Sequence, residues 1–115
     1  MLTLEGLRAY GADVDGGLKR CFNKEDFYLR LVKLCLSDPN FDRLAAAMAS
    51  GDARDAFEAA HSLKGSTGNL SLTPLSAPLI EMTDRLRDGG PVADVSGLYA
   101  RIEAALAEAR RLIEP

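Results

Sequence analysis

The segment ARDAFEAAHSLKGSTGNL, residues 53–70, carries the clearest helical pattern in the chain. At about 100° per residue, its apolar and small residues fall on one side of a helix, and most of its polar residues and glycines fall on the other. Asp52, directly before the segment, is a good N-cap, so the sequence predicts a helix from Ala53 to about Asn69. The residues predicted to face the core are Ala56, Ala60, Leu63, Thr67 and Leu70.

Two short helices are expected at the N-terminus. The first covers residues 2–10 and ends at Gly11, because glycine readily adopts the left-handed conformation that ends helices. The second begins after Asp13 or Asp15, since either side chain can cap it. Its apolar residues are Leu18, Cys21 and Phe22.

Two longer helices are predicted between these and the central segment. Asn23 is a good cap for the first, which ends near Leu36. Asp38 followed by Pro39 is a strong start signal for the second, and Gly51 ends it. The residues expected to face the core are Phe27, Leu31, Leu34 and Cys35 in the first helix and Phe41, Leu44, Ala45 and Met48 in the second.

Two further helices are predicted after the central segment. A Thr-Pro pair starts a helix over residues 73–87. Because proline inside a helix removes a backbone hydrogen bond, Pro78 predicts a kink or a later start near Ser76. Asp94 is the expected cap of the last helix. The buried stripe predicted there is Val95, Leu98, Ile102, Leu106 and Ile113.

Strand-like alternation of apolar and polar residues is absent, so the expected fold class is all-α. Four substantial helices joined by short loops favour an antiparallel four-helix bundle, with the short N-terminal helices packed on one end. With 115 residues and no repeats, the chain is expected to form one domain over residues 1–115.

Composition excludes several classes of partner. The chain has 14 basic and 17 acidic residues and a net charge of −3, so nucleic acid is not an expected partner. The longest uninterrupted apolar run, residues 44–49, is far below the roughly 20 residues that cross a bilayer, so no membrane insertion is expected. The opening residues do not resemble a secretory signal, and two cysteines are too few for a framework of several disulfide bonds. We therefore expect a cytoplasmic location.

His61, the only histidine, projects roughly 130° away from the core face of its helix and should point at solvent. Arg54, Glu58, Gly65 and Gly68 lie on the same side. Each glycine inside a helix costs roughly 0.5–1 kcal/mol relative to alanine. Since a neighbour without a side chain leaves room beside the imidazole, we interpret Gly65 as giving another protein access to the ring.

These residues favour transfer of a phosphoryl group. A solvent-exposed imidazole is largely neutral near pH 7, and its free nitrogen lone pair can attack phosphorus. Lys64, three residues after His61, can reach the negative group that the ring would carry. The chain has no convergent carboxylates to hold Mg²⁺, so we expect no cofactor or metal of its own and a Mg²⁺ ion on the partner.

Residues 60–70, AHSLKGSTGNL, resemble the signature of histidine-containing phosphotransfer (HPt) domains. The similarity extends over about residues 14–89. It includes Gly17-Leu18-Lys19-Arg20, Phe27-Tyr28, Leu31, Gly51-Asp52 and Ile80-Glu81. One departure is Ser71, where the family often has glycine, and it leaves the geometry of the following turn open.

The resemblance implies a four-helix bundle whose exposed histidine takes a phosphoryl group from the aspartate of one receiver domain and gives it to another. His61 would be the phosphorylation site, Lys64 would neutralise the phosphoryl oxygens and Gly65 would keep the approach open. The implied partners are the receiver domain of a response regulator and a hybrid sensor histidine kinase. The protein itself would have no kinase or ATP-binding activity. Residues expected to contact the partner are Phe57, Glu58, Ser62 and Gly68.

Several residues also have a purely structural interpretation. Gly65 could serve a close helix crossing, Gly68 could be the C-terminal cap of its helix, and Phe57 could belong to the core. Cys21 and Cys35 lie in apolar stripes, so we expect buried thiols. The alternative function is a helical adaptor that binds a signalling protein without carrying phosphate. An independent enzyme is less favoured, because one histidine without triad partners or a metal cluster offers little chemistry.

Overall fold

All the predicted helices form in the computed structural model, which describes residues 1–115 and contains no β-strand. The bounds of two of them, the central helix and the one after it, agree with the sequence-based prediction. In chain order the elements are α1 (Leu4–Tyr10), α2 (Val14–Arg20), α3 (Glu25–Leu36), α4 (Asn40–Ser50), α5 (Ala53–Asn69), α6 (Thr73–Arg87), the 3-10 helix η1 (Val92–Val95) and α7 (Ser96–Arg111).

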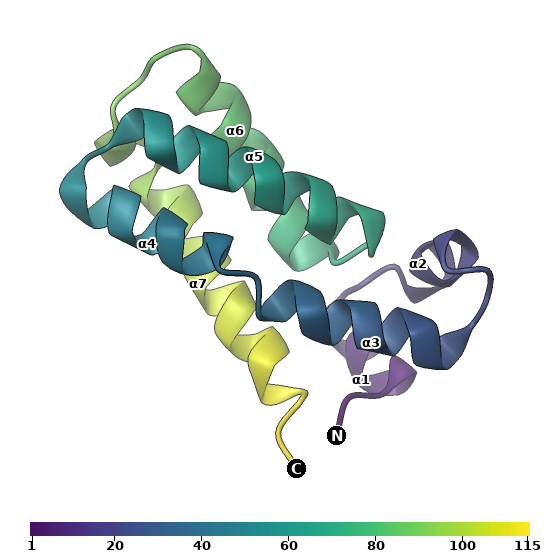
Figure 1. Ribbon diagram of the computed structural model, residues 1–115. Helices are drawn as coiled ribbons and strands as arrows, with labels where there is room; N and C mark the ends of the chain where they lie inside the picture. The colour runs from purple at the N-terminus through teal and green to yellow at the C-terminus, as the bar shows by residue number, and fades with distance from the viewer.

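The helices α4, α5, α6 and α7 form the bundle (Figure 1). The pairs α4 with α5, α5 with α6 and α6 with α7 make its main contacts, and each pair is antiparallel. α3 continues roughly in line with α4, while α1 and α2 lie at the end of the bundle where α5 turns into α6. The expected all-α bundle with short N-terminal helices on one end is therefore confirmed. None of the helices combines the length and the apolar character needed to span a membrane.

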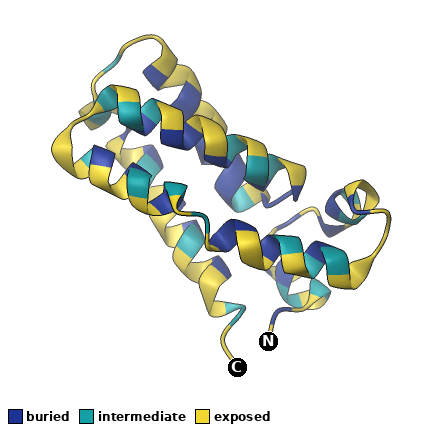
Figure 2. Ribbon diagram, in the orientation of Figure 1, coloured by how far each residue is buried: buried dark blue, intermediate teal, exposed yellow.

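The core lies where the inner faces of these helices meet (Figure 2). The α5 face is made of small residues: Ala56, Ala60 and the unpredicted Ala59 are fully buried beside Leu63. Thr67 is buried as well, and its hydroxyl donates to the Leu63 carbonyl at 2.7 Å, which satisfies a polar group inside the core. The predicted core face of α5 is thus confirmed.

Capping explains why several helix ends could be predicted. The Asp52 side chain accepts from the Asp55 amide at 3.0 Å, and Gly51 before it is left-handed with φ of 79°. Asp13 caps α2 in the same way. The Asp38 carboxylate accepts from the Asn40 amide at 2.8 Å at the start of α4. Such side chains satisfy amides that have no partner inside the helix.

Three predictions around α2 and α3 differ from the structure. α2 ends at Arg20, and Phe22 and Asn23 are left-handed, with φ of 59° and 57°. Phe22 is consequently 79% exposed rather than packed, and Lys24 takes the N-cap position predicted for Asn23. The core face of α3 is also rotated by about one residue. Cys35 is buried as predicted, but Phe27 and Leu31 are only half-buried, Leu34 is 63% exposed, and the other buried residues are Tyr28, Val32 and Leu36.

The remaining differences concern α4, α6 and the last helix. In α4 Ala45 is exposed and Ala47 is buried instead. α6 does not begin late near Ser76: it runs from Thr73 straight through Pro78, whose buried apolar ring compensates for the missing hydrogen bond.

Asp94 caps no α-helix, because it lies in η1 and α7 begins at Ser96 without a side-chain cap. The predicted stripe holds for Val95, Leu98 and Ile102. Further along, small residues take the core positions: Ala105 and Ala109 are buried, whereas Leu106 and Ile113 are only half-buried.

The turn from Leu70 to Leu72 joins α5 to α6. The Leu72 amide donates to Thr67 at 2.9 Å and the Ser71 amide to Gly68 at 3.0 Å, the two bonds of a Schellman motif. This motif requires a left-handed residue, and Ser71 takes that role with φ of 56°. The position at which the family often has glycine is therefore one where a serine is strained.

The N-terminal helices hold this turn in place. Arg20 donates to the Ser71 hydroxyl at 2.6 Å and to the Asn69 carbonyl at 3.2 Å. The Asp13 amide donates to the Ser71 carbonyl at 2.9 Å, and the buried Tyr28 hydroxyl donates to the Leu70 carbonyl at 2.8 Å. These hydrogen bonds compensate for the strain at Ser71 and hold the turn in the observed conformation.

Gly17 lets α2 approach the Tyr28 ring and the Leu70 carbonyl closely, so its replacement by alanine should destabilise the protein. A Cβ atom there would lie 2.5 Å from the Tyr28 ring and 2.8 Å from the Leu70 carbonyl oxygen. We expect a loss of about 1–3 kcal/mol in the free energy of unfolding, measured by urea denaturation. Gly97→Ala is the matched control, because a Cβ at Gly97 meets nothing within 4 Å. Equal stability of the two variants would contradict the proposed packing.

Candidate functional site

His61 lies in the middle of α5 and is exposed, as predicted. Its ring stacks on Phe57 one turn earlier, with 5.9 Å between ring centroids and 16° between ring planes. The guanidinium of Arg87, which reaches across from α6, lies 5.8 Å from the centroid of the Phe57 ring. Phe57 is half-buried, so it contributes to the core and also orients the imidazole.

The two glycines near His61 have no packing role. A Cβ atom built at Gly65 or Gly68 would meet nothing within 4 Å, which rules out a close helix crossing at either position. Gly68 is not the C-terminal cap either, because α5 continues to Asn69 and the left-handed residue is Ser71. Since Gly65 and Gly68 follow His61 by one and two turns, they leave an open strip beside it.

Lys64 and Ser62 lie next to His61 on α5. Lys64 is half-buried and forms no ion pair with any carboxylate of the chain, so its ammonium group is available to an incoming anion. Ser62 is exposed beside the histidine. Ser66, one turn after Ser62, is half-buried, and its hydroxyl lies 3.8 Å from the Cys35 thiol of α3.

Glu58, one turn before His61, is held by arginines. Its carboxylate lies 2.7 Å from Arg43 of α4 and 3.5 Å from Arg54 of its own helix. Arg43 also bonds the Asp55 carboxylate through Nε at 2.9 Å and Nη2 at 2.5 Å. Sequence reasoning missed Arg43, which neutralises the carboxylates of Asp55 and Glu58 on the helix that carries His61.

No group of three or more His, Cys, Asp and Glu side chains is arranged to hold a metal ion. The two cysteines, Cys21 and Cys35, are free and buried, as predicted. Burial raises the pKa of the Cys35 thiol, the largest effect there, and the Ser66 hydroxyl partly opposes it. These thiols belong to the core rather than to a reactive site.

Comparison with known proteins identifies one family. The family model described as the Hpt domain matches residues 37–112, a range that holds α4 to α7 and therefore the helix of His61. Searches of curated proteins and of solved structures gave no significant match.

The bond between Arg43 and Asp55 should give the protein an acid-dependent stability. Hydrogen bonding from Arg43 lowers the pKa of Asp55 below its ordinary value. A lowered folded-state pKa stabilises the protein above the unfolded-state pKa of about 3.9, and this contribution is lost as the pH falls through the folded-state value. We therefore expect Asp55→Asn to lower the melting temperature at neutral pH, with a difference that shrinks in acid.

The measurement is thermal unfolding by circular dichroism between pH 7 and pH 2. Asp42→Asn is the control, because Asp42 is an exposed carboxylate on α4 with no ion pair. A difference between wild type and Asp55→Asn that stayed constant over the whole range would contradict the role given to Arg43.

Proposed function

The chain belongs to the Hpt domain family, whose members are phosphotransfer carriers in two-component signalling, and from this we propose that it is a phosphorelay intermediate. It accepts a phosphoryl group on His61 from the aspartate of one receiver domain and passes it to another. The observation that carries the proposal is the exposure of the only histidine in the middle of α5, within the residues that match the family.

The transfer needs one nucleophile on this chain. The lone pair of a neutral ring nitrogen of His61 attacks phosphorus, and the bond between phosphorus and the aspartyl oxygen breaks as the carboxylate leaves with its electron pair. The proton on the other ring nitrogen stays on the imidazole. In the second half of the relay, an aspartate of the next receiver attacks and the bond between phosphorus and the ring nitrogen breaks. The chain returns to its starting state.

Lys64 and Gly65 support this step. The unpaired ammonium of Lys64 neutralises the phosphoryl oxygens while the group is on the ring. The absent side chain at Gly65 lets the receiver aspartate approach in line. Mg²⁺, which phosphoryl transfer from an aspartate needs, is held by the receiver domain in this proposal, and the chain has no kinase activity of its own.

The proposed partners are the receiver domain of a response regulator and a hybrid sensor histidine kinase, and the proposed location is the cytoplasm. A docked receiver would contact four residues around His61 on α5, the exposed Glu58 and Ser62 and the half-buried Phe57 and Gly68.

Incubation with a receiver domain carrying ³²P-aspartyl phosphate should label the chain on His61. A phosphohistidine is labile in acid and stable in base, so the label should disappear at low pH and survive alkali. His61→Gln should take up no label, because glutamine has no nucleophilic ring nitrogen. Labelling of His61→Gln at the wild-type rate would contradict the proposal. If His61→Ala kept both receiver affinity and downstream signalling, the protein would be an adaptor instead.

Gly65→Leu should separate function from stability. A Cβ atom at this position meets nothing within 4 Å, the position is exposed, and leucine removes the cost of a helical glycine, so the melting temperature should stay the same or rise. Because the side chain would stand in the path of the receiver aspartate, we expect phosphotransfer to slow by about a hundredfold. Gly97→Leu on α7 is the matched control, with equal room for a Cβ. An unchanged transfer rate for Gly65→Leu would contradict the interpretation that Gly65 gives the receiver access to His61.

A further inference from the structure

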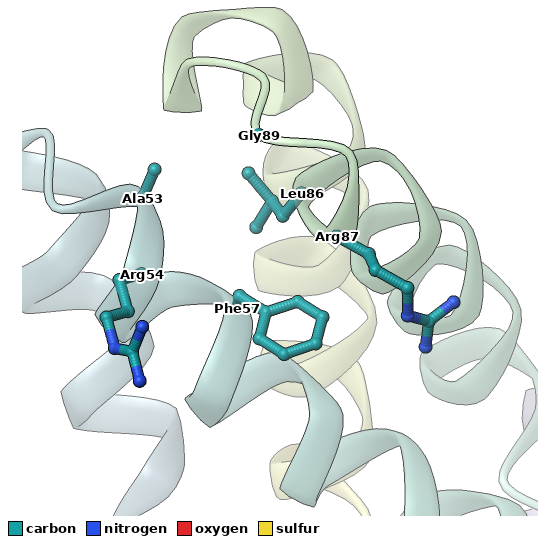
Figure 3. A pocket seen from close by; sticks show the side chains of 6 residues that line it. All are labelled: Ala53, Arg54, Phe57, Leu86, Arg87 and Gly89. Atoms are coloured by element: carbon teal, nitrogen blue, oxygen red, sulfur yellow. The ribbon is translucent and has the colours of Figure 1, made fainter.

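A pocket of about 430 Å³ lies beside His61, between the start of α5 and the end of α6 (Figure 3). Six residues line it: Ala53, Arg54, Phe57, Leu86, Arg87 and Gly89. Its volume is at the small end of the range of ligand pockets and is enough for one large side chain.

The lining of the pocket combines an apolar floor with two positive charges. Ala53, Phe57 and Leu86 form the apolar part, and the guanidinium groups of Arg54 and Arg87 lie on either side of the Phe57 ring. Two guanidinium groups that flank an aromatic ring favour an occupant that is apolar at its centre and acidic at its edge.

Both arginines can change partner at little cost. Arg87 pairs with Asp84 at 3.0 Å and Arg54 with Glu58 at 3.5 Å, but all four side chains are at least 45% exposed. Exposed ion pairs of this kind are weak, because water screens them and both side chains lose freedom when they pair. A carboxylate from another protein can therefore compete for either guanidinium.

Phe57 connects the pocket to the phosphorylation site. One face of its ring stacks on His61, and the same side chain lines the pocket. His61 itself does not line the pocket, but anything bound there touches the residue on which the imidazole stacks, so a protein that uses the pocket is positioned along α5 before the phosphoryl group moves.

We propose that this pocket receives an apolar side chain of the receiver domain, with a neighbouring receiver carboxylate paired to Arg54 and Arg87. The inference rests on the proposed function. A protein that transfers phosphoryl groups from an aspartate must hold a divalent cation with carboxylates, so the face that it presents to His61 is acidic. The two arginines complement that charge, and the apolar floor gives the contact a fixed position.

The test compares two ways of phosphorylating His61. Phosphoramidate, a small donor, needs no docking, whereas a receiver domain charged with acetyl phosphate does. The probe is the receiver from the same genome that labels the wild-type chain fastest. For each variant, the rate with the receiver is divided by the rate with phosphoramidate. We expect this ratio to fall by about tenfold for Arg87→Glu, because the steering charge is reversed.

Ala53→Phe, which fills the pocket without changing its charge, should lower the same ratio. Arg101→Glu is the matched control, since Arg101 is an exposed arginine on α7 that does not line the pocket, and its ratio should remain at the wild-type value. Circular dichroism checks that each variant is folded.

The outcomes distinguish the inference from the proposed function. If no receiver labels the wild-type chain, the proposed function fails and this inference fails with it. If the wild-type chain is labelled but Arg87→Glu and Ala53→Phe keep the ratio of the control, the function stands and the docking pocket is wrong. A wild-type dimer in size-exclusion chromatography that Arg87→Glu dissociates would assign the pocket to a second copy of the chain and overturn the inference.

Discussion

The left-handed turn at Ser71 is the constraint on which the arrangement of the site depends. It reverses the chain between α5 and α6, and so it fixes which residues of the two helices lie opposite each other. This register brings Phe57 of α5 beside Arg87 of α6, the contact that orients His61 and forms one side of the pocket. A different turn would shift this register and separate the two residues.

Prediction from sequence succeeded for most local signals, although the caps expected at Asn23 and Asp94 are wrong, and it failed where a partner far along the chain selects the buried face. Asp52 and the proline at the start of α6 mark helix ends through their own backbone chemistry, and the bounds of α5 and α6 follow from them. α3 has apolar residues around most of its circumference, so periodicity alone does not select its buried face. The bond from Tyr28 to the Leu70 carbonyl selects it, and that contact joins residues 42 positions apart.

The same distinction applies to the site. His61, Lys64 and Gly65 share one helix face, so the helical period of about 100° per residue places them correctly relative to one another. The neutralisation of Glu58 by Arg43 needs two helices, and it becomes visible only once α4 and α5 are known to be antiparallel. Arg43 lies seven residues before the end of α4 and Glu58 five residues after the start of α5, so the short loop at residues 51–52 brings the two side chains close together. Antiparallel pairing across a short loop is thus the signal that could have identified Arg43.

Residues 1–36, which precede the family match, hold part of the matching region in its conformation. The match begins at residue 37, yet Asp13, Arg20 and Tyr28 supply the hydrogen bonds that hold the turn after α5. A glycine at position 71 would adopt the left-handed conformation without strain. With serine there, the strain is offset by a hydroxyl that accepts from Arg20, so the N-terminal helices and the serine are coupled. The geometry around His61 therefore depends on residues that share neither its helix nor the family match.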